Sequence, residues 1–129
     1  MKKEVNIMFA LTLVLICIFA GAMGQICFKR GMSDMDKVNG IRDLLNFEML
    51  FDIIINKYII FGVFLYGFSF ILWLGALSTL DLSYMYPLLS LGYLITAIFA
   101  FVFLKEDISV IRWTGIILVV IGCFLISRS

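Results

Sequence analysis

The sequence predicts an all-α integral membrane protein with four transmembrane helices. Hydrophobic residues make up 64% of the 129 residues and charged residues only 15%, whereas soluble domains have about 45–50% and 25%. The apolar residues gather in long runs, and a helix needs about 20 such residues to cross roughly 30 Å of hydrocarbon. The polar links between these runs leave no room for a separate soluble domain. We therefore expect residues 1–129 to form a single membrane domain.

The apolar runs give the expected bounds of the helices. After a short tail (1–4), the spans are predicted at about 5–28, 58–80, 82–104 and 108–126. The last two spans are joined only by Lys105–Asp107, a link so short that the two helices must be antiparallel neighbours. We expect the rest of the chain to pack against this hairpin.

Proline and glycine residues predict local features of the second and third spans. Pro87 lies in the first turns of the third span, where it removes a backbone donor and is expected to bend the helix. Gly62, Gly67 and Gly75 lie in the second span, and small residues allow a neighbouring helix to approach closely.

The first span and the link after it each leave a choice open. Lys2, Lys3 and Ala20–Ala22 imitate a signal peptide, but the apolar run exceeds the 7–15 residues typical of one, so cleavage is not expected. The link 29–57 is the only sizeable polar segment. Within it, Ile41–Ile55 has apolar residues at helical spacing, which fits an amphipathic helix in the membrane interface or a plain surface connector equally well.

The charges of the links predict an orientation. Four spans place both termini on one side, which carries Lys2, Lys3 and Arg128. The opposite side carries more basic residues: Lys29, Arg30, Lys37, Arg42, Lys57, Lys105 and Arg112. The positive-inside rule therefore predicts that the first and third links face the cytoplasm and that the termini lie outside.

The composition argues against an enzyme. Histidine, the commonest general base and metal ligand, is absent. Cys17, Cys27 and Cys123 lie inside apolar spans without a CxxC pair and are interpreted as small apolar side chains. No acid lies deep in a span, where a charge costs at least about 2.5–3.5 kcal/mol. We expect no catalytic residue, metal or cofactor, and proton exchange through a buried carboxylate has little support.

Neutral polar residues within the spans are the candidates for binding a substrate. Gln25 lies in the first span, and Tyr86, Ser90 and Tyr93 are spaced four and three residues apart in the third, so that these three share one helix face. They could line a pathway for a polar head group, together with Gln25. Alternatively, they bond neighbouring helices, or mark the membrane interface as Tyr84 is expected to do.

Two further groups of residues have a functional and a plain interpretation. Five basic residues lie at span ends on one membrane side and together could attract an anionic lipid phosphate: Lys29, Arg30, Lys57, Lys105 and Arg112. The plain interpretation, snorkelling and topology signalling, is preferred. Gly115 and Gly122 in the fourth span leave a smooth groove for another helix of this chain or of a second subunit. Because four short helices enclose little interior, a dimer is the expected working unit.

Several segments resemble the small four-helix members of the drug/metabolite transporter superfamily, which include small multidrug resistance and EamA-like proteins. They are Met23–Lys29, Tyr86–Leu91, Phe103–Ser109 and Trp113–Gly115. The pattern is most similar to the small subunits that flip aminoarabinose linked to undecaprenyl phosphate. This resemblance implies a dimer of four-helix units, with a cavity lined by the first three helices and a contact through glycines seven residues apart in the fourth.

The resemblance also contains one departure. Small multidrug exporters need a glutamate midway along the first helix, and Gly21 occupies the corresponding position. This departure favours a transporter that flips a polyprenyl-phosphate-linked sugar, or a similar anionic lipid, across the cytoplasmic (inner) membrane. Its expected partners are membrane lipids, that substrate, and a like or related subunit, without nucleic acid. The alternatives are an efflux protein of the small multidrug resistance type and a non-transporting subunit of a glycolipid-processing complex.

Overall fold

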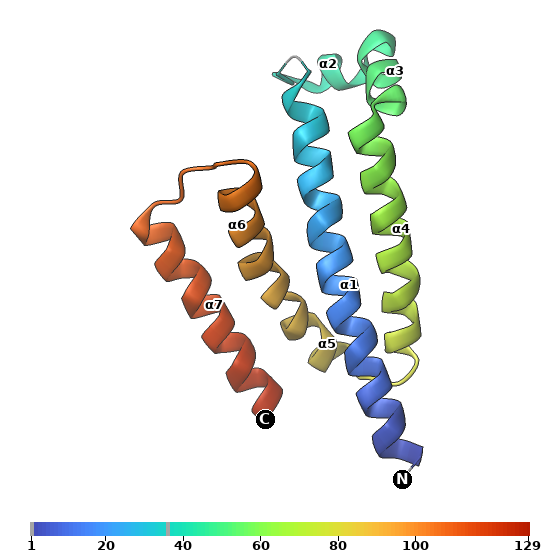
Figure 1. Cartoon of the computed structure of the whole chain (residues 1–129), viewed down its shortest axis with the longest axis vertical. Coiled ribbons are helices and arrows are strands. Elements are labelled where there is room, and N and C mark those ends of the chain that lie inside the picture. The colour runs from blue at the N-terminus through green and yellow to red at the C-terminus, as the bar shows by residue number, and fades with distance from the viewer. Residues whose placement is uncertain (1, 36) are drawn as a thin grey trace.

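The protein is a bundle of long helices that run side by side (Figure 1). The computed structural model describes residues 2–35 and 37–129, without the side chains of residues 2–5. Its elements are α1 (Lys2–Ser33), α2 (Ile41–Leu45), α3 (Phe47–Ile55), α4 (Lys57–Leu77), α5 (Leu82–Leu89), α6 (Leu91–Phe103) and α7 (Val110–Arg128). Within the described residues, four segments are long and apolar enough to cross a membrane. The predicted all-α fold with four spans is confirmed, and the chain is a multi-pass membrane protein.

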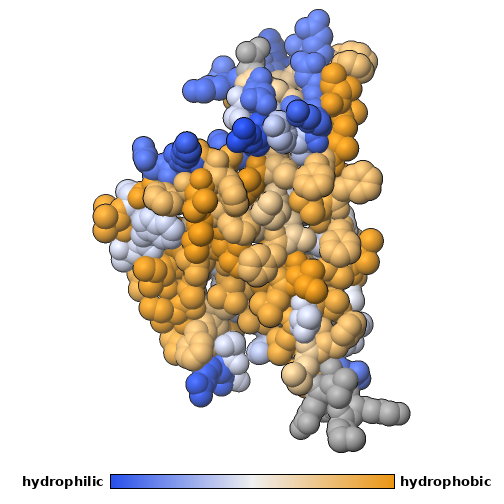
Figure 2. Space-filling model, in the orientation of Figure 1, coloured by the Kyte–Doolittle hydropathy of each residue, from blue (hydrophilic) through white to orange (hydrophobic). Residues whose placement is uncertain are grey.

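The distribution of polar residues agrees with this membrane topology. Figure 2 shows an apolar body with hydrophilic residues over α2, α3 and the α6–α7 loop, and again at the C-terminal tip. Large apolar side chains point outward from the body, such as Phe64, which is 75% exposed. Both termini lie at the end opposite α2 and α3 (Figure 1), so the prediction that they share one side is confirmed.

Helix α1 is longer than the predicted first span. It begins at Lys2 and continues to Ser33, a length of 32 residues. The expected tail is therefore wrong from Lys2 onward, while Met1 lies outside the described residues. At 1.5 Å per residue such a helix is about 48 Å long, more than the roughly 30 Å of hydrocarbon. Its ends must therefore extend into the membrane interfaces.

Close packing of α1 against α4 depends on glycines. A Cβ atom added to Gly24 would lie 3.2 Å from the carbonyl oxygen of Gly62, and one added to Gly62 would lie 3.0 Å from that of Gly24. Gly75 has Leu13 of α1 at 3.3 Å from its added Cβ, whereas Gly67 has nothing within 4 Å. The expected close approach is confirmed at Gly62 and Gly75 and is wrong at Gly67.

The core lies where α1, α4 and α5 meet. Its fully packed members are Val14 and Ile18 of α1, Ala76 of α4 and Met85 of α5, with relative exposures of 0–4%. Helix α6 also contacts α1, and α7 packs on α5 and α6. The pair α1–α4 therefore forms the main frame, and α5–α7 is attached to one side of it, rather than being the centre on which the other helices pack.

The polar link forms two short helices over 41–55, where the sequence left both an amphipathic helix and a plain surface connector open. Asn46 separates α2 from α3, and its side-chain oxygen accepts a hydrogen bond from the Glu48 amide at 3.1 Å. Asn56 separates α3 from α4 and accepts from the Tyr58 amide at 3.0 Å. Asparagine competes with helical hydrogen bonding in this way and favours caps. The Asn56 amide nitrogen also donates to the Gly31 carbonyl at 3.3 Å, which ties α1 to α4.

The third span is interrupted, as expected from Pro87. It consists of α5 and α6, which meet at Ser90. Proline has no N–H to continue the helical ladder and its ring displaces the preceding turn. The Ser90 amide bonds to the Pro87 carbonyl at 3.1 Å, and the Cys123 thiol of α7 donates to the same carbonyl. The thiol bond thus joins α7 to the end of α5 at the break in the third span.

Candidate functional site

A cavity of about 790 Å³ opens between α1, α4, α5, α6 and the first turns of α7. Much of its lining is apolar or aromatic, with neutral polar groups between and two charged side chains at one end. The lining residues are Cys17, Ile18, Gly21, Ala22, Gln25, Tyr66, Ser69, Phe70, Trp73, Tyr86, Leu89, Gly92, Tyr93, Thr96, Ala97, Ala100, Glu106, Ile108, Arg112 and Ile116. Small-molecule sites in proteins have this size and this mixture of groups.

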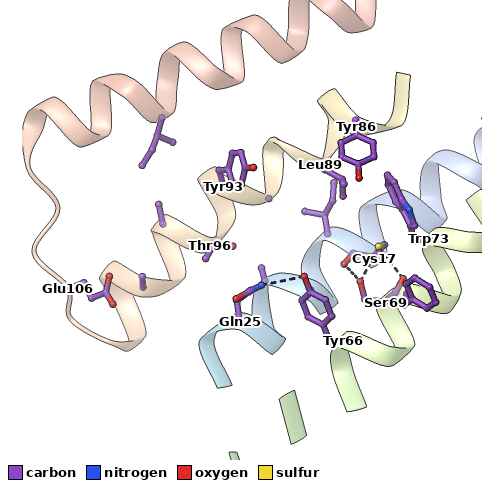
Figure 3. A pocket seen from close by; sticks show the side chains of 18 of the residues that line it. Cys17, Gln25, Tyr66, Ser69, Trp73, Tyr86, Leu89, Tyr93, Thr96 and Glu106 are labelled. Atoms are coloured by element: carbon purple, nitrogen blue, oxygen red, sulfur yellow. Dashed lines mark hydrogen bonds between the residues drawn. The ribbon is translucent and has the colours of Figure 1, made fainter. Parts of the chain in front are cut away.

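One wall of the cavity consists of aromatic rings and a buried polar pair. The rings of Tyr86 and Trp73 meet edge to face with centroids 5.9 Å apart, an arrangement that aromatic quadrupoles favour. Below them, the Ser69 hydroxyl donates to the Cys17 carbonyl at 3.0 Å, and the Cys17 sulfur lies 3.1 Å from the Ser69 oxygen (Figure 3). This pair is satisfied within the protein, so its role is to join α1 and α4.

Other polar groups face the cavity without comparable constraint. The amide of Gln25 donates to the Tyr66 hydroxyl at 3.4 Å, a long bond between two exposed side chains (Figure 3). Tyr93 is 66% exposed and Tyr86 is 62% exposed, although both line the cavity. Thr96, one turn further along α6, lines it too. These groups retain capacity for hydrogen bonds with the hydroxyl groups of a ligand.

The neutral candidates are only partly brought together. Gln25, Tyr86 and Tyr93 line the cavity, whereas Ser90 is not among the lining residues. The Ser90 hydroxyl donates to the Pro87 carbonyl at the break between α5 and α6. The prediction that Tyr86, Ser90 and Tyr93 share one face assumed an unbroken helix. The break at Ser90 removes this residue from the face that lines the cavity.

The cationic candidates Lys29, Arg30 and Lys105 lie outside the cavity lining. All of them are exposed. The Arg30 guanidinium lies over the Tyr58 ring, 5.8 Å from its centroid, which holds it near the start of α4. Lys105 adopts φ 54°, a left-handed conformation that non-glycine residues adopt at a cost of roughly 1–2 kcal/mol. These residues place positive charge around the end of the bundle rather than inside it.

Two charged residues line the cavity. Arg112 is one of the cationic span ends that were expected to attract a phosphate, whereas Glu106 was not selected from the sequence. The left-handed turn at Lys105 folds the chain back, so that the Glu106 amide donates to the Ala100 carbonyl at 3.2 Å. The side-chain oxygen of Ser109 accepts from the Arg112 amide at 3.2 Å and caps α7. The sequence could have indicated this cap, because serine is favoured at the N-cap position of a helix. Nothing in the sequence marks the left-handed turn, since glycine is absent there.

Three glycines singled out from the sequence can be placed in the structure. Gly21, where small multidrug exporters have a glutamate, lies in the cavity wall, and an added Cβ would be 3.4 Å from the Ser69 hydroxyl. This part of the cavity wall therefore has a small residue instead of an acid. Gly115 and Gly122 of α7 have nothing within 4 Å of an added Cβ, so no other part of the described chain packs against them.

Comparisons with known proteins agree with a transport function. The sequence profile of the EamA-like transporter family matches residues 42–128. A protein of Proteus mirabilis (strain HI4320), named probable 4-amino-4-deoxy-L-arabinose-phosphoundecaprenol flippase subunit ArnF, is 32% identical over 110 residues, 83% of each chain. A second protein of this strain is named as the ArnE subunit of the same probable flippase. It is 26% identical over 120 residues, which cover 93% of this chain and 98% of that protein.

A further relative extends the range of organisms. The ArnF subunit of Shewanella sediminis (strain HAW-EB3) is 39% identical over 67 residues, 50% of this chain and 46% of that protein. No solved structure gives a significant match. The relatives carry transporter names, which confirms the expected resemblance and agrees with a non-enzymatic role.

Proposed function

This chain belongs to the EamA-like transporter family, and from that premise we propose that it flips a polyprenyl-phosphate-linked sugar across the membrane. The observation that carries the proposal is the cavity itself. It has about 790 Å³ of space and lies between membrane-spanning helices. The sugar and phosphate would occupy it, while the prenyl tail stays in the lipid.

The lining groups suit a sugar. Gln25, Tyr66, Tyr93 and Thr96 offer neutral donors and acceptors, and the Tyr86 and Trp73 rings offer flat apolar surfaces. Neutral hydrogen-bonding groups recognise hydroxyls without the desolvation cost of buried charge. These features support Gln25, Tyr86 and Tyr93 as substrate contacts; Ser90 would act through the shape of the α5–α6 break.

The charges support a place for the phosphate. Arg112 lines the cavity, and Lys29, Arg30 and Lys105 are exposed on the links. Arginine binds phosphate oxygens in a bidentate manner. We propose that Arg112 contacts the phosphate, and that the other three attract it from the anionic surface of the cytoplasmic leaflet. This arrangement assumes the orientation with the first and third links in the cytoplasm and an inner-membrane location.

The working unit is proposed to be a dimer with a like or related small subunit. Gly115 and Gly122 leave open space on α7, where the exposed apolar residues Leu118 (63%) and Ile126 (50%) flank them. Small residues on a membrane helix allow a partner helix to approach closely. The relatives are named as flippase subunits, which supports an assembly of more than one chain.

The test is transport in vesicles. The full chain, with any subunit that copurifies, is reconstituted with undecaprenyl-phosphate-aminoarabinose, and an impermeant amine-reactive reagent reports the fraction in the outer leaflet over time. We expect faster flipping than in protein-free vesicles. Gln25→Leu should slow it roughly threefold to tenfold, since a hydrogen bond contributes about 0.5–1.5 kcal/mol. Met23→Ala, outside the cavity lining, should not.

Other results would favour the alternatives. Transport of quaternary cations driven by a proton gradient, without movement of the lipid, would indicate an efflux protein. Movement of neither substrate, while the chain copurifies with a glycolipid enzyme, would indicate an accessory subunit. Either result refutes the proposed flipping.

A further inference from the structure

Helix α3 presents large apolar side chains outward at the polar end of the bundle. They are spaced three and four residues apart and so share one helix face: Phe47, Leu50, Phe51 and Ile54, which are 80%, 40%, 54% and 68% exposed. Apolar patches of this kind mark surfaces that contact a protein or a membrane. We propose that this face, together with the neighbouring cations Arg30 and Lys57, docks on the surface of an anionic lipid leaflet.

The polar residues of α3 occupy another face of the helix. Glu48, Asp52 and Ile55 are spaced four and three residues apart, and they line a hollow of about 740 Å³ with residues of α2 and of the segment after α1. An amphipathic helix at the surface of a soluble protein turns its apolar face toward the protein, whereas α3 turns that face outward. This is the orientation of a helix whose apolar face enters the boundary between head groups and acyl chains.

The apolar face of α3 continues into a surface that faces lipid. Helix α3 ends at Ile55, and the membrane-spanning α4 begins at Lys57. Phe61 and Phe64 of α4 are 57% and 75% exposed. Along the right edge of Figure 2, apolar residues continue from this end of the bundle into the apolar body. The lipid that surrounds α4 therefore reaches α3 without any further partner.

Two cations at the start of α4 supply the preference for negative charge. The Arg30 guanidinium of α1 and the Lys57 ammonium of α4 lie 5.8 Å and 5.2 Å from the centroid of the same ring, that of Tyr58. The ring holds both cations but provides no oxygen acceptor for their N–H groups. Basic groups from neighbouring membrane helices bind anionic head groups in this way. The carboxylates of Glu48 and Asp52 are directed to the hollow, and they leave the apolar face of α3 uncharged.

The first test measures the contact of α3 with acyl chains. The full chain carries Trp73→Phe and Trp113→Phe and one new tryptophan as reporter, in nanodiscs of phosphatidylcholine whose acyl chains are brominated near the head group. Bromine quenches tryptophan fluorescence only at close range. We expect Phe51→Trp to be quenched as strongly as Phe64→Trp in the span α4. Glu48→Trp, on the other face of α3, should be quenched several-fold less.

The second test measures the choice of lipid. Tyr58→Trp keeps an aromatic ring between the cations, and mixed nanodiscs contain phosphatidylcholine and anionic phosphatidylglycerol, with bromine on one lipid or the other. We expect brominated phosphatidylglycerol to quench more than its share of the lipid. Arg30→Gln and Lys57→Gln should each lower this preference by about fivefold, the value of one cation near an anionic surface. Arg128→Gln removes a cation over the Phe124 ring near the C-terminus, and should leave the preference unchanged.

Three results would overturn the inference. Phe51→Trp that emits as in water and is not quenched shows that α3 lies outside the membrane; Phe47→Trp gives the same information if Phe51→Trp cannot be purified. A shielded but unquenched reporter, whose emission shifts when a copurified subunit is removed, shows that a protein covers this face. Equal quenching by the two lipids at Tyr58→Trp excludes the anionic leaflet. None of these measurements involves the cavity, so their failure leaves the proposed transport unaffected.

Discussion

The contact between α1 and α4 allows a quantitative prediction with a control on the same helix. Gly62 and Gly67 both lie within α4, but only Gly62 faces α1. An added Cβ at Gly62 would lie 2.8 Å from the Phe28 ring and 3.0 Å from the Gly24 carbonyl oxygen, whereas one at Gly67 meets nothing within 4 Å. Replacing each glycine by alanine therefore adds the same methyl group to α4, once against α1 and once in open space.

The two substitutions share one contribution and differ in another. Alanine is favoured over glycine inside a helix by about 0.8–1 kcal/mol, and this gain applies at both positions. At Gly62 the new methyl group also overpacks the interface, which costs about 1–3 kcal/mol. The Phe28 ring can turn away, but the Gly24 carbonyl belongs to the backbone and cannot. We therefore expect Gly62→Ala to be less stable than Gly67→Ala by about 1–3 kcal/mol.

The measurement is the free energy of unfolding in detergent micelles, followed by far-UV circular dichroism during denaturation. Gly67→Ala should be at least as stable as wild type, and Gly62→Ala should fall below it. Because the gain in helix propensity cancels in the comparison, equal stabilities for the two variants would refute the close α1–α4 contact at Gly24 and Gly62.

Two further predictions concern the ends of helices. Asn56→Ala should lower the free energy of unfolding by about 1–2 kcal/mol, because it removes the α4 cap and the bond to Gly31. Asn56→Asp keeps the cap acceptor and should recover part of this loss in the same denaturation assay. Equal stabilities of the two variants would contradict the role of Asn56 as the α4 cap. Lys105→Gly should raise the thermal midpoint by relieving a left-handed conformation worth roughly 1–2 kcal/mol. Lys105→Ala, which retains the strain, should not raise it, and equal midpoints for the two would contradict this turn geometry.

The arrangement of helices was largely predictable because its signals are local. Each apolar run is long enough to cross the bilayer, and unpaired backbone groups are so costly there that a helix is the natural structure for a single run. An irregularity in the third span near Pro87 was predictable for the same reason, since proline acts on its own helix. The sequence left the segment 41–55 open between an amphipathic helix and a plain connector. The structure divides it at Asn46, whose side chain caps α3 and thereby interrupts the helix that the apolar spacing suggested.

The cavity was predictable only in part. Gln25, Tyr86 and Tyr93 line it as the polar pattern suggested, whereas Ser90 bonds to the Pro87 carbonyl. The sequence predicted a bend caused by Pro87. It did not predict that the helix would break at Ser90 or that the Ser90 hydroxyl would bond to the Pro87 carbonyl. Likewise, the sequence of the second span could not distinguish Gly62, which faces α1, from Gly67, which faces outward. Both are glycines in an apolar helix, and the sequence does not show which side of that helix another helix contacts.

The sequence alone determined that this protein spans the membrane four times, brings its termini to one side, and contains no histidine for catalysis. Those properties depend on the composition and on the lengths of the apolar runs, and neither depends on contacts between residues that are distant in the sequence. Only the tertiary structure decided that Glu106, among three neighbouring charged residues, enters the cavity, while Lys105 and Asp107 stay outside. That choice depends on the left-handed backbone of Lys105 and on where α6 packs against α1 and α7, and neither is encoded in the local sequence pattern.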